Sequence, residues 1–552
     1  MENKQRYLHI HHNDNVLVAL QDLEEGETIF FEGVSFTLPN RVKAKHKFTI
    51  KPLPIGSEIK MYGVLVGKSN RDFIQGELLT TENTVHAAED FTLRERQVEW
   101  KKPDNSKFIG KTFKGFHRKN GTVGTANHWL VIPLVFCENR NIQVLKDALE
   151  EQLGFKKAKS YEPEVEELIE LYKSGKTVEE VLSADLSNLR STNDSKKIFK
   201  NIDGIKFLSH DMGCGGTRVD SDALCGLLAG YVTHPNVAGA TILSLGCQHA
   251  QASILKKEIL LRDPSFDKPL YVLEQQKMGL ESTMIQEALK LTFTGLMLAN
   301  QQERQDASLS ELTIGLECGG SDGFSGISAN PALGYVSDLL VSLGGKVILS
   351  EFPELCGVEQ ELSDRCVDEA TALKFMSLMK TYNAKAEQDG SGFYANPSPG
   401  NIRDGLITDA IKSAGAAKKG GTSPVVDVVD YPGICTKDGL TLLCTPGNDV
   451  ESTTAEVGAG ANVVLFTTGL GTPTGNPIAP VIKLSTNTVI FEKMHDIIDL
   501  NCGTIIEGSE TIAQTGERIL DYVISVASGE VQPKAVQLGQ DDFIPWRRGI
   551  SL

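Results

Sequence analysis

The residues best suited to chemistry lie in one glycine-rich stretch, residues 315–334, which reads GLECGGSDGFSGISANPALG. Its six glycines let the backbone approach a ligand closely, and their N–H groups can bind an anion. Cys318 could serve as a metal ligand, and Asp322 as a ligand or a proton-transferring group. Taken alone, the stretch could also be a glycine-rich surface turn.

Other loops of unusual composition lie next to segments that are typical of buried strands. In an open parallel sheet such loops share one edge, where ligands bind. The loops are residues 121–127, 137–139, 210–217, 246–249, 350–354, 445–449, 467–471 and 501–503. Because several of them contain Cys or His, the sequence predicts that they form a common site with residues 315–334.

Cysteines in several of these loops could converge with His210 or His249 on a soft or borderline metal such as iron. The cysteines concerned are Cys214, Cys247, Cys318 and Cys502. They lack the close pairing of a zinc ribbon, which argues against a structural zinc site. The other cysteines are assigned to packing, with Cys137 intermediate between the two groups.

Three further acids, Glu351, Glu354 and Glu359, form a second group after the apolar segment KVIL. Their carboxylates could bind a hard cation or act as a general base. The alternative is a solvated helix start, where acidic residues favour the helix dipole.

Near the N-terminus, polar residues gather in two clusters that could place acid–base groups and positive charge beside a carboxylate substrate. The first cluster comprises His9, His11, His12, Asp14 and Asn15, and the second comprises Lys45, His46 and Lys47. Ordinary polar residues at strand ends are the alternative interpretation.

The elements that must position these residues change in character along the chain. Residues 7–90 contain short alternating apolar segments between Gly, Pro and Asn turns, which is typical of a small β-domain. From residue 113 onward, apolar β-branched runs alternate with helical segments, which indicates parallel α/β lobes. The predicted division is a β-domain at 1–92, a linker at 93–112, a first α/β lobe at 113–390 and a C-terminal α/β lobe at 391–552.

Composition excludes several classes of function. The formal net charge is −17, with no dense basic block, which argues against binding to nucleic acid or to an anionic membrane. The longest strongly apolar run, residues 129–137, is too short to span a membrane. The polar N-terminus lacks a signal peptide's apolar core and the ten cysteines lack a paired framework, so we expect a cytoplasmic protein with reduced thiols. No strand leads into the GxGxxG pattern of a dinucleotide oxidoreductase.

Together these motifs resemble the altronate/galactarate dehydratase family over about residues 7–528. The resemblance rests on HHNDNVLVAL and KHKF, then GTVGTANHWLVIPLVFCENRN, HDMGCGG, LAGYVTHPNVAGATILSLGCQ, ECGGSDGFSGISANPALG and ILSEFPELCGVE, and further on NPSPGN, AKKGGTSPVVDV, CTPGND, FTTGLGTPTGNPIAPVIKLSTNT and DLNCG. It implies a small SAF-type β-domain followed by Rossmann-like α/β lobes. It also implies dehydration of a sugar acid with a divalent metal, usually ferrous iron.

The expected reaction converts D-altronate to 2-dehydro-3-deoxy-D-gluconate and water, a step in hexuronate breakdown. Alternatives on the same scaffold are a galactarate dehydratase, a sulfo-lyase acting on sulfolactate, and an inactive sugar-acid-binding protein. Mn²⁺ or an iron–sulfur cluster on three of the cysteines could replace Fe²⁺, and we expect a homo-oligomer without nucleic-acid or membrane partners.

For this reaction the sequence predicts three groups of residues. The predicted metal ligands are His210, Cys214, Cys247, Cys318 and Cys502. The predicted substrate-binding residues are Asn15, Thr125, Asn127, Gly319, Gly320, Ser321, Asp322 and Asn330. The predicted catalytic residues are His11 and His46 for proton transfer, Lys47 for the substrate carboxylate, and Asp14.

Overall fold

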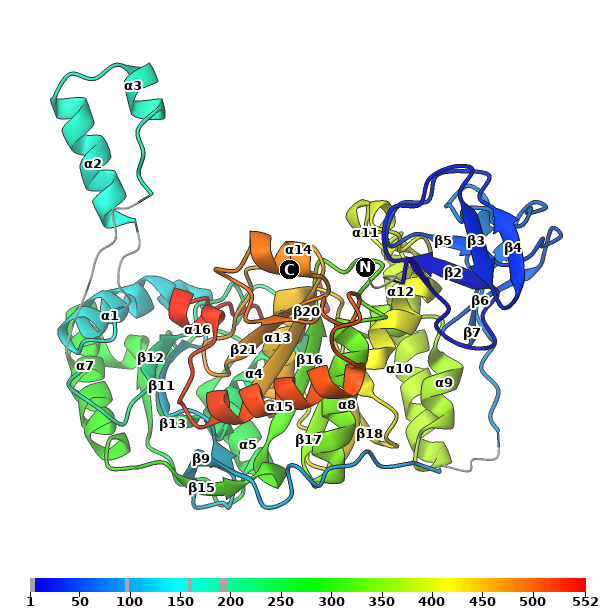
Figure 1. Ribbon diagram of the computed structural model, residues 1–552. Helices are drawn as coiled ribbons and strands as arrows, with labels where there is room; N and C mark the ends of the chain where they lie inside the picture. Colours follow the sequence, from blue (N-terminus) through cyan, green and yellow to red (C-terminus); the bar gives the residue numbers. More distant parts are fainter. Residues whose placement is uncertain (1–4, 95–98, 157–160, 188–196) are drawn as a thin grey trace.

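The computed structural model describes residues 5–94, 99–156, 161–187 and 197–552. Figure 1 shows a small β-domain (blue) on one side, an extended α/β body, and a helical arm that stands away from the body on the other side. This arrangement confirms the expected fold class, a small β-domain followed by parallel α/β lobes. Within the described ranges, no helix combines the length and the apolar character needed to cross a membrane.

The β-domain is built from short antiparallel strands joined by tight turns. They form the sheets β1-β2-β5, β3-β4 and β6-β7-β8. The strands are β1 (Tyr7–Leu8), β2 (Val16–Ala19), β3 (Thr28–Phe31), β4 (Val34–Thr37), β5 (Lys47–Thr49), β6 (Glu58–Met61), β7 (Val64–Ser69) and β8 (Thr84–Val85). β2 and β5 are fully buried: Leu17, Ala19 and Phe48 pack in the domain's own core, and Val16 and Val18 pack in the large core shared with the C-terminal lobe.

The first α/β lobe contains a four-stranded parallel sheet in the order β12-β11-β13-β14. Its strands are β11 (His128–Pro133), β12 (Gly204–Phe207), β13 (Val237–Ser244) and β14 (Leu270–Glu274). Its helices are η1 (Phe136–Glu138), α1 (Asn139–Gln152), α4 (Arg218–Thr233), α5 (Ala252–Arg262), α6 (Gln275–Met278) and α7 (Glu281–Ala299). The arm consists of α2 (Glu162–Lys173) and α3 (Val178–Leu182).

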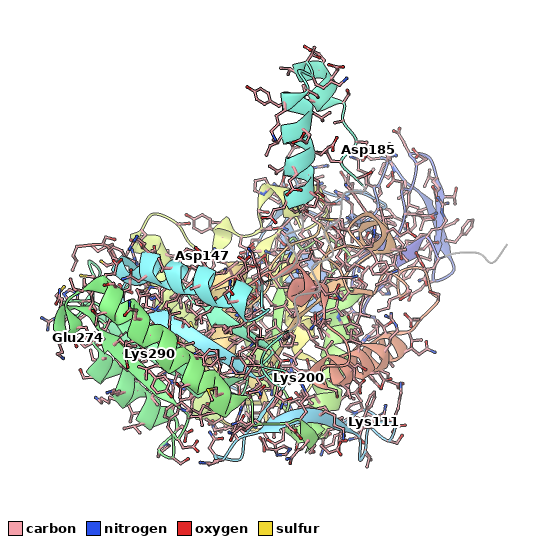
Figure 2. All side chains as sticks on the ribbon, turned by 90° about the vertical axis from the view of Figure 1, so that its left-hand side faces the viewer. Lys111, Asp147, Asp185, Lys200, Glu274 and Lys290 are labelled. Atoms are coloured by element: carbon pink, nitrogen blue, oxygen red, sulfur yellow. The ribbon has the colours of Figure 1, made fainter. Side chains whose placement is uncertain are left out.

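The two faces of this sheet are covered by different helices. Alternate residues of β11 point to opposite sides, so Trp129 and Val131 pack with α1 and α7 while Leu130 and Ile132 pack with α4 and α5. Figure 2 looks onto the first of these layers, where α1, carrying Asp147, and α7, carrying Lys290, lie side by side. A strand buried on both faces must be apolar throughout, which explains the continuous run in β11.

The C-terminal lobe contains a seven-stranded parallel sheet in the order β18-β19-β17-β16-β20-β21-β22. Its strands are β16 (Thr313–Cys318), β17 (Lys346–Leu349), β18 (Val425–Asp430), β19 (Gly439–Cys444), β20 (Val463–Thr468), β21 (Val481–Ser485) and β22 (Leu500–Asn501). Its helices are η2 (Leu309–Glu311), α8 (Ala329–Ser342), η3 (Phe352–Leu355), α9 (Glu359–Asp364), α10 (Glu369–Gln388), η4 (Phe393–Ala395), α11 (Pro399–Arg403), α12 (Asp409–Ala416), η5 (Ala417–Gly420), α13 (Asp449–Gly458), α14 (Thr488–Lys493), α15 (Ile512–Ala527) and α16 (Lys534–Leu538). A small antiparallel sheet of β9 (Thr112–His117), β10 (Val123–Gly124) and β15 (Gln305–Ser308) lies at the junction of the two lobes.

The predicted boundary between residues 390 and 391 does not separate the two sheets. β16 and β17 precede residue 390, yet they pair with β20 and β19, which follow it. The first lobe therefore ends near residue 300, after α7, and the C-terminal lobe begins with η2. The composition change near residue 390 marks only a loop after α10, because strand pairing is decided by contacts distant in sequence. Of the predicted linker at 93–112, residues 95–98 lie outside the described ranges, and β9 begins at its end.

The two lobes share a hydrophobic core between α4 and α13. The helices approach so closely that a Cβ added at Gly230 would lie 2.1 Å from the backbone oxygen of Gly458. Backbone atoms cannot move aside as the end of a flexible side chain can, so this crossing requires glycine. It also fixes α13, whose first residue is Asp449.

Replacing Gly230 with Ala should separate α4 from α13 and lower the free energy of unfolding by about 1–3 kcal/mol, the usual cost of overpacking. Urea denaturation would measure the loss. The matched control is Gly400→Ala, because the added Cβ would meet its nearest neighbours at 3.7 and 3.8 Å, an ordinary contact. Equal stability of the two variants would contradict this account of the lobe junction.

Candidate active site

The site forms where β16 and β17 end side by side. These strands pair in parallel, with Leu316 opposite Leu349, so the residues that follow them emerge at the same edge of the sheet. β16 ends at Cys318, and the chain after β17 supplies Glu351 and, through η3, Glu354. Glu351 has a φ of 61°, a left-handed conformation that is uncommon for residues other than glycine. The fold therefore holds this carboxylate in a strained position, as is frequent in functional sites.

A buried ammonium group joins these side chains. Lys419 Nζ lies 2.9 Å from Cys318 Sγ and 2.5 Å from Glu351 Oε2. The thiol also lies 3.2 Å from Glu354 Oε2, and Lys412 Nζ donates to Glu354 Oε1 at 2.6 Å. Burial raises the pKa of the Cys318 thiol, and the two glutamates raise it further. Burial opposes the charge of Lys419, but the thiol and the acids around it raise its pKa well above the usual value.

Two more glutamates lie completely buried behind this group. Glu317 and Glu456 each have one side-chain oxygen without a hydrogen-bond partner. A chain of hydroxyls leads from Thr445 through Ser452 to Ser350, which donates to Glu456 at 2.7 Å. Burial raises the pKa of Glu456 to about 8, with a further upward contribution from Glu351. At neutral pH, Glu456 therefore holds a proton close to the Cys318 edge.

A cavity of about 260 Å³ opens onto the same edge. Its wall is formed by Cys318, Gly319, Gly320, Ser321, Glu354, Asn396, Ser398, Asn401, Lys412, Gly447, Asp449 and Leu470. Burial raises the pKa of Asp449 to about 7, and the charges of Glu351 and Glu354 raise it further. A carboxyl group that titrates near neutral pH in such a wall can act as a general acid or base.

The small β-domain is tied to this region through Lys45. Its Nζ lies 3.0 Å from Asp322 Oδ2 and 3.0 Å from Asp404 Oδ1. Burial alone would lower the pKa of Lys45, but the two carboxylates outweigh it and raise the pKa. Lys47 is also buried, and its Nζ donates to the backbone oxygens of Lys45 and Gly405. Burial lowers the pKa of Lys47 to about 7, although the charge of Asp322 opposes the shift.

One group of side chains fits a divalent cation. Ligand atoms of Cys318, Glu351 and Glu354 all lie within 4.8 Å of one another. A thiol with two carboxylates is a borderline donor set, suited to iron or manganese more than to calcium. Glu351 also forms a side-chain hydrogen bond with the buried Glu317, whose pKa burial raises well above its usual value.

Comparison with known proteins shows which family models and which relatives the chain matches. Three family models match it in order: an altronate/galactarate dehydratase SAF domain at residues 5–87, a D-galactarate dehydratase/altronate hydrolase second domain at 115–300, and a D-galactarate/altronate dehydratase C-terminal domain at 309–551. Altronate dehydratase from Bacillus subtilis (strain 168) is 32% identical over 529 residues, 95% of each chain. Altronate dehydratase from Escherichia coli (strain K12) is 31% identical over 525 residues, 95% of this chain and 96% of the relative. The L-threo-forming galactarate dehydratase of the same strain is 30% identical over 540 residues, 97% of this chain and 95% of the relative.

The chain belongs to the altronate/galactarate dehydratase family. Its small β-domain is the SAF domain of that family. The family's second and C-terminal domains match ranges that meet where the four-stranded sheet gives way to the seven-stranded one.

Of the predicted metal ligands, only Cys318 belongs to a compact ligand group in the part of the chain that the structure describes. The two ring nitrogens of His210 are both engaged, because Nε2 lies 2.8 Å from the oxygen of Pro133 and the N–H of Met212 donates to Nδ1. Cys502 is fully buried in the core of the C-terminal lobe, and burial raises its pKa to about 12. Cys214 and Cys247 lie in the segments that follow β12 and β13 of the other sheet.

The predicted substrate-binding residues divide into two groups. Gly319, Gly320 and Ser321 line the cavity, and their role in substrate binding stays a prediction. Asp322 instead forms an ion pair with Lys45. The side chain of Asn330 is used in hydrogen bonds within the protein, since it donates to Gly415 and accepts from Thr467.

The remaining predicted substrate ligands use their polar groups to hold the fold. Thr125 donates to Asn462, and Asn127 donates to the backbone oxygens of Asn201 and Ala299, which ties the lobes and β11 together. Asn15 bridges to β6, since it donates to the oxygen of Glu58 and accepts from the N–H of Lys60.

None of the four predicted catalytic residues lines the cavity. Asp14 accepts from the backbone N–H groups of His11, Tyr62 and Gly63, so it holds two turns of the SAF domain together. The His11 ring accepts from Asn13, and the His46 ring contacts the oxygen of Ala44. Their roles in proton transfer stay predictions.

Sequence reasoning missed the lysines and the acid that complete the site. Lys412 and Lys419 belong to α12 and η5, and Lys419 lies 101 residues beyond Cys318. Asp449 ends the loop at residues 445–449, which the sequence did place at a strand end. The pair Lys418–Lys419 before two glycines was a usable signal, because charged residues are rare in so apolar a segment.

Replacing Lys45 with Met should leave the carboxylate of Asp322, which is completely buried, without its main charge partner. Breaking a buried ion pair in this way costs about 3–5 kcal/mol. We expect the first urea transition to shift to lower denaturant as the SAF domain loosens. The control Lys43→Met removes an exposed lysine and should change little. A Lys45→Met protein as stable as wild type would contradict the docking role of this residue.

Proposed function

We propose that this protein is a hydro-lyase that removes water from a sugar acid, with D-altronate as the substrate and 2-dehydro-3-deoxy-D-gluconate as the product. The observation that carries the proposal is the acid-rich, lysine-containing wall of the 260 Å³ cavity at the Cys318 edge. The two altronate dehydratases, which align over 95% of this chain, support it.

Dehydration removes the weakly acidic proton beside the carboxylate and expels the neighbouring hydroxyl, so negative charge develops on the carboxylate. Lys412 lines the cavity, and the charge of Glu354 outweighs burial and raises its pKa. It therefore remains cationic at neutral pH and can bind the substrate carboxylate as that charge grows. The backbone N–H groups of the 319–321 segment line the same cavity and can orient the substrate.

Asp449 is the group we assign to removal of the proton. It lines the cavity, and its pKa of about 7 makes it a far better base than an ordinary carboxylate. Gly319 permits its position, because an added Cβ there would lie 2.0 Å from Asp449 Oδ2. A glycine at this point lets the carboxylate approach the backbone of the substrate-binding segment.

Cys318, Glu351 and Glu354 would hold a divalent cation, Fe²⁺ or alternatively Mn²⁺. Such a cation supplies positive charge to a carboxylate and an adjacent hydroxyl. The surplus of buried acids over lysines around this group favours an added cation. A cytoplasmic location, a homo-oligomer and a place in hexuronate breakdown complete the proposal.

The main alternative is a galactarate dehydratase, supported by the E. coli relative that is 30% identical. A sulfo-lyase and an inactive binding protein are further alternatives. The purified protein should be assayed anaerobically with ferrous iron against D-altronate, galactarate and sulfolactate, with 2-keto acid formation as the readout. We expect D-altronate to react fastest. If only galactarate reacts, the protein is a galactarate dehydratase, and if only sulfolactate reacts, it is a sulfo-lyase. Binding without turnover would favour an inactive binding protein.

Replacing Asp449 with Asn should lower kcat by about 10²–10⁴-fold, the usual contribution of a general base. In wild type, kcat/KM should fall as the pH drops through about 7, because the base form of Asp449 exists only above its pKa. Steady-state kinetics between pH 5 and 9 would show this limb. Asp438→Asn, an exposed acid, is the control. An Asp449→Asn enzyme within tenfold of wild type would remove Asp449 from the proton transfer.

A further inference from the structure

Three cysteines follow three neighbouring strands of the first lobe. Cys137 comes after β11, Cys214 after β12 and Cys247 after β13. β11 lies between the other two in a parallel sheet, so all three segments leave the same edge (Figure 1). This edge belongs to a different sheet from the Cys318 site.

Backbone hydrogen bonds bring the three segments into direct contact. The N–H of Phe136 donates to the oxygen of Met212 at 3.1 Å, and the N–H of His249 donates to the oxygen of Gly213 at 3.0 Å. Each cysteine therefore lies within two residues of a bonded contact between segments. Gly213 makes the approach possible, since a Cβ there would lie 2.1 Å from the oxygen of Leu134.

Two of these cysteines are more exposed than any other cysteine of the described residues. Cys137 and Cys247 are exposed and Cys214 is half-buried. The remaining cysteines are buried apart from Cys356, which is half-buried. Free cysteines usually avoid the surface, because an exposed thiol is open to oxidation and a buried one gains from packing. Three accessible thiols at one sheet edge, with none in a disulfide, indicate a site for a ligand.

The three cysteine thiolates determine which kind of metal centre fits this site. Three thiolates without a carboxylate among them are soft ligands, which favour iron–sulfur clusters or another thiophilic metal. Among the described residues, only the Cys318 group has all its ligand atoms within 4.8 Å, so the three sulfurs here are spread more widely than a single ion requires. A cluster separates its thiolates further than one ion does, because bridging iron and sulfide lie between them.

The C-terminal tail and the active-site helix both lie near this edge. The N–H of Leu552 donates to the oxygen of Gly215, and Arg547 donates to the oxygen of Asp211. Burial raises the pKa of Glu451, and the charge of Asp211 raises it further. Glu451 stands in the first turn of α13, close to Asp449 of the cavity. The segment that carries Cys214 is therefore tied to the C-terminal tail, and the charge of Asp211 reaches the first turn of α13.

We propose that Cys137, Cys214 and Cys247 bind an iron–sulfur cluster through three thiolates, which leaves one iron without a cysteine ligand. This centre is distinct from the Cys318 group. The inference goes beyond the proposed function and does not depend on which sugar acid is the substrate.

The test uses the full-length protein, purified anaerobically and reconstituted with ferric iron, sulfide and a thiol reductant. Iron content, acid-labile sulfide and visible charge-transfer absorbance are measured, with circular dichroism as a check on folding. We expect wild type to hold sulfide-bound iron, and Cys137→Ser, Cys214→Ser and Cys247→Ser each to lose most of it. The controls Cys225→Ala, a buried packing residue, and Cys318→Ala, at the other site, should keep the sulfide content.

A second measurement covers variants that fail to fold. In wild type, the three cysteines should resist alkylation when reconstituted and react once iron is removed by a chelator, as followed by mass spectrometry. Wild type without acid-labile sulfide, or serine variants with wild-type sulfide content, would overturn the proposal. If Cys318→Ala were the only variant to lose its sulfide, the cluster would have to be assigned to the Cys318 site instead. None of these readouts requires turnover, so failure of the substrate assay and failure of this inference remain distinguishable.

Discussion

An excess of buried acid over buried base at the end of β16 is the constraint on which the rest of the structure depends. Glu317, Glu351 and Glu456 are all completely buried around one ammonium group, that of Lys419. Moving several charges out of water costs more free energy than one ion pair recovers. A buried cluster of acids is therefore stable only where bound protons, hydroxyl donors or further cations offset that cost. The raised pKa of Glu456 and the Thr445–Ser452–Ser350 chain are those compensations. The remaining imbalance is the physical basis for the proposed cation at this edge.

The scaffold meets this constraint with elements far apart in the chain. Parallel pairing of β16 and β17 brings Cys318 and Glu351 together, and the loop after β17 holds Glu351 at positive φ. η5 then carries Lys419 in from 68 residues beyond Glu351. The SAF domain adds a further cation: Lys45, also at positive φ, forms an ion pair with Asp322, which follows the cavity residues Gly319, Gly320 and Ser321. Backbone strain and buried charge thus lie together at one edge of the sheet. The packing of the surrounding helices offsets their free-energy cost.

Much of this was readable in the sequence, and the failures have physical causes. The β-domain, the parallel sheets and the cavity residues Gly319, Gly320 and Ser321 were predicted from local patterns. His210 and Asn127 have side chains suited to a metal or a substrate, but the structure uses both in hydrogen bonds to backbone oxygens. Residue type alone could not reveal this. Glu351 and Glu354 were recognised as possible ligands on a loop that shares a predicted site with residues 315–334, but the sequence did not pair them with Cys318 itself. The lobe boundary failed for a related reason, since a change in composition does not reveal which strands pair.

The sequence by itself determined the family, the order of its domains and the loops that end its buried strands, because these depend on short-range patterns and long motifs. Only the tertiary structure decided which side chains share a site. It placed Lys419 against Cys318 and Glu351, assigned Asp14 and Asn330 to holding the fold, and separated Cys318 from the three accessible cysteines of the other sheet. The physical reason is that partnership between buried polar groups is set by strand order and domain docking, which bring together residues hundreds of positions apart, as Lys45 and Asp404 show.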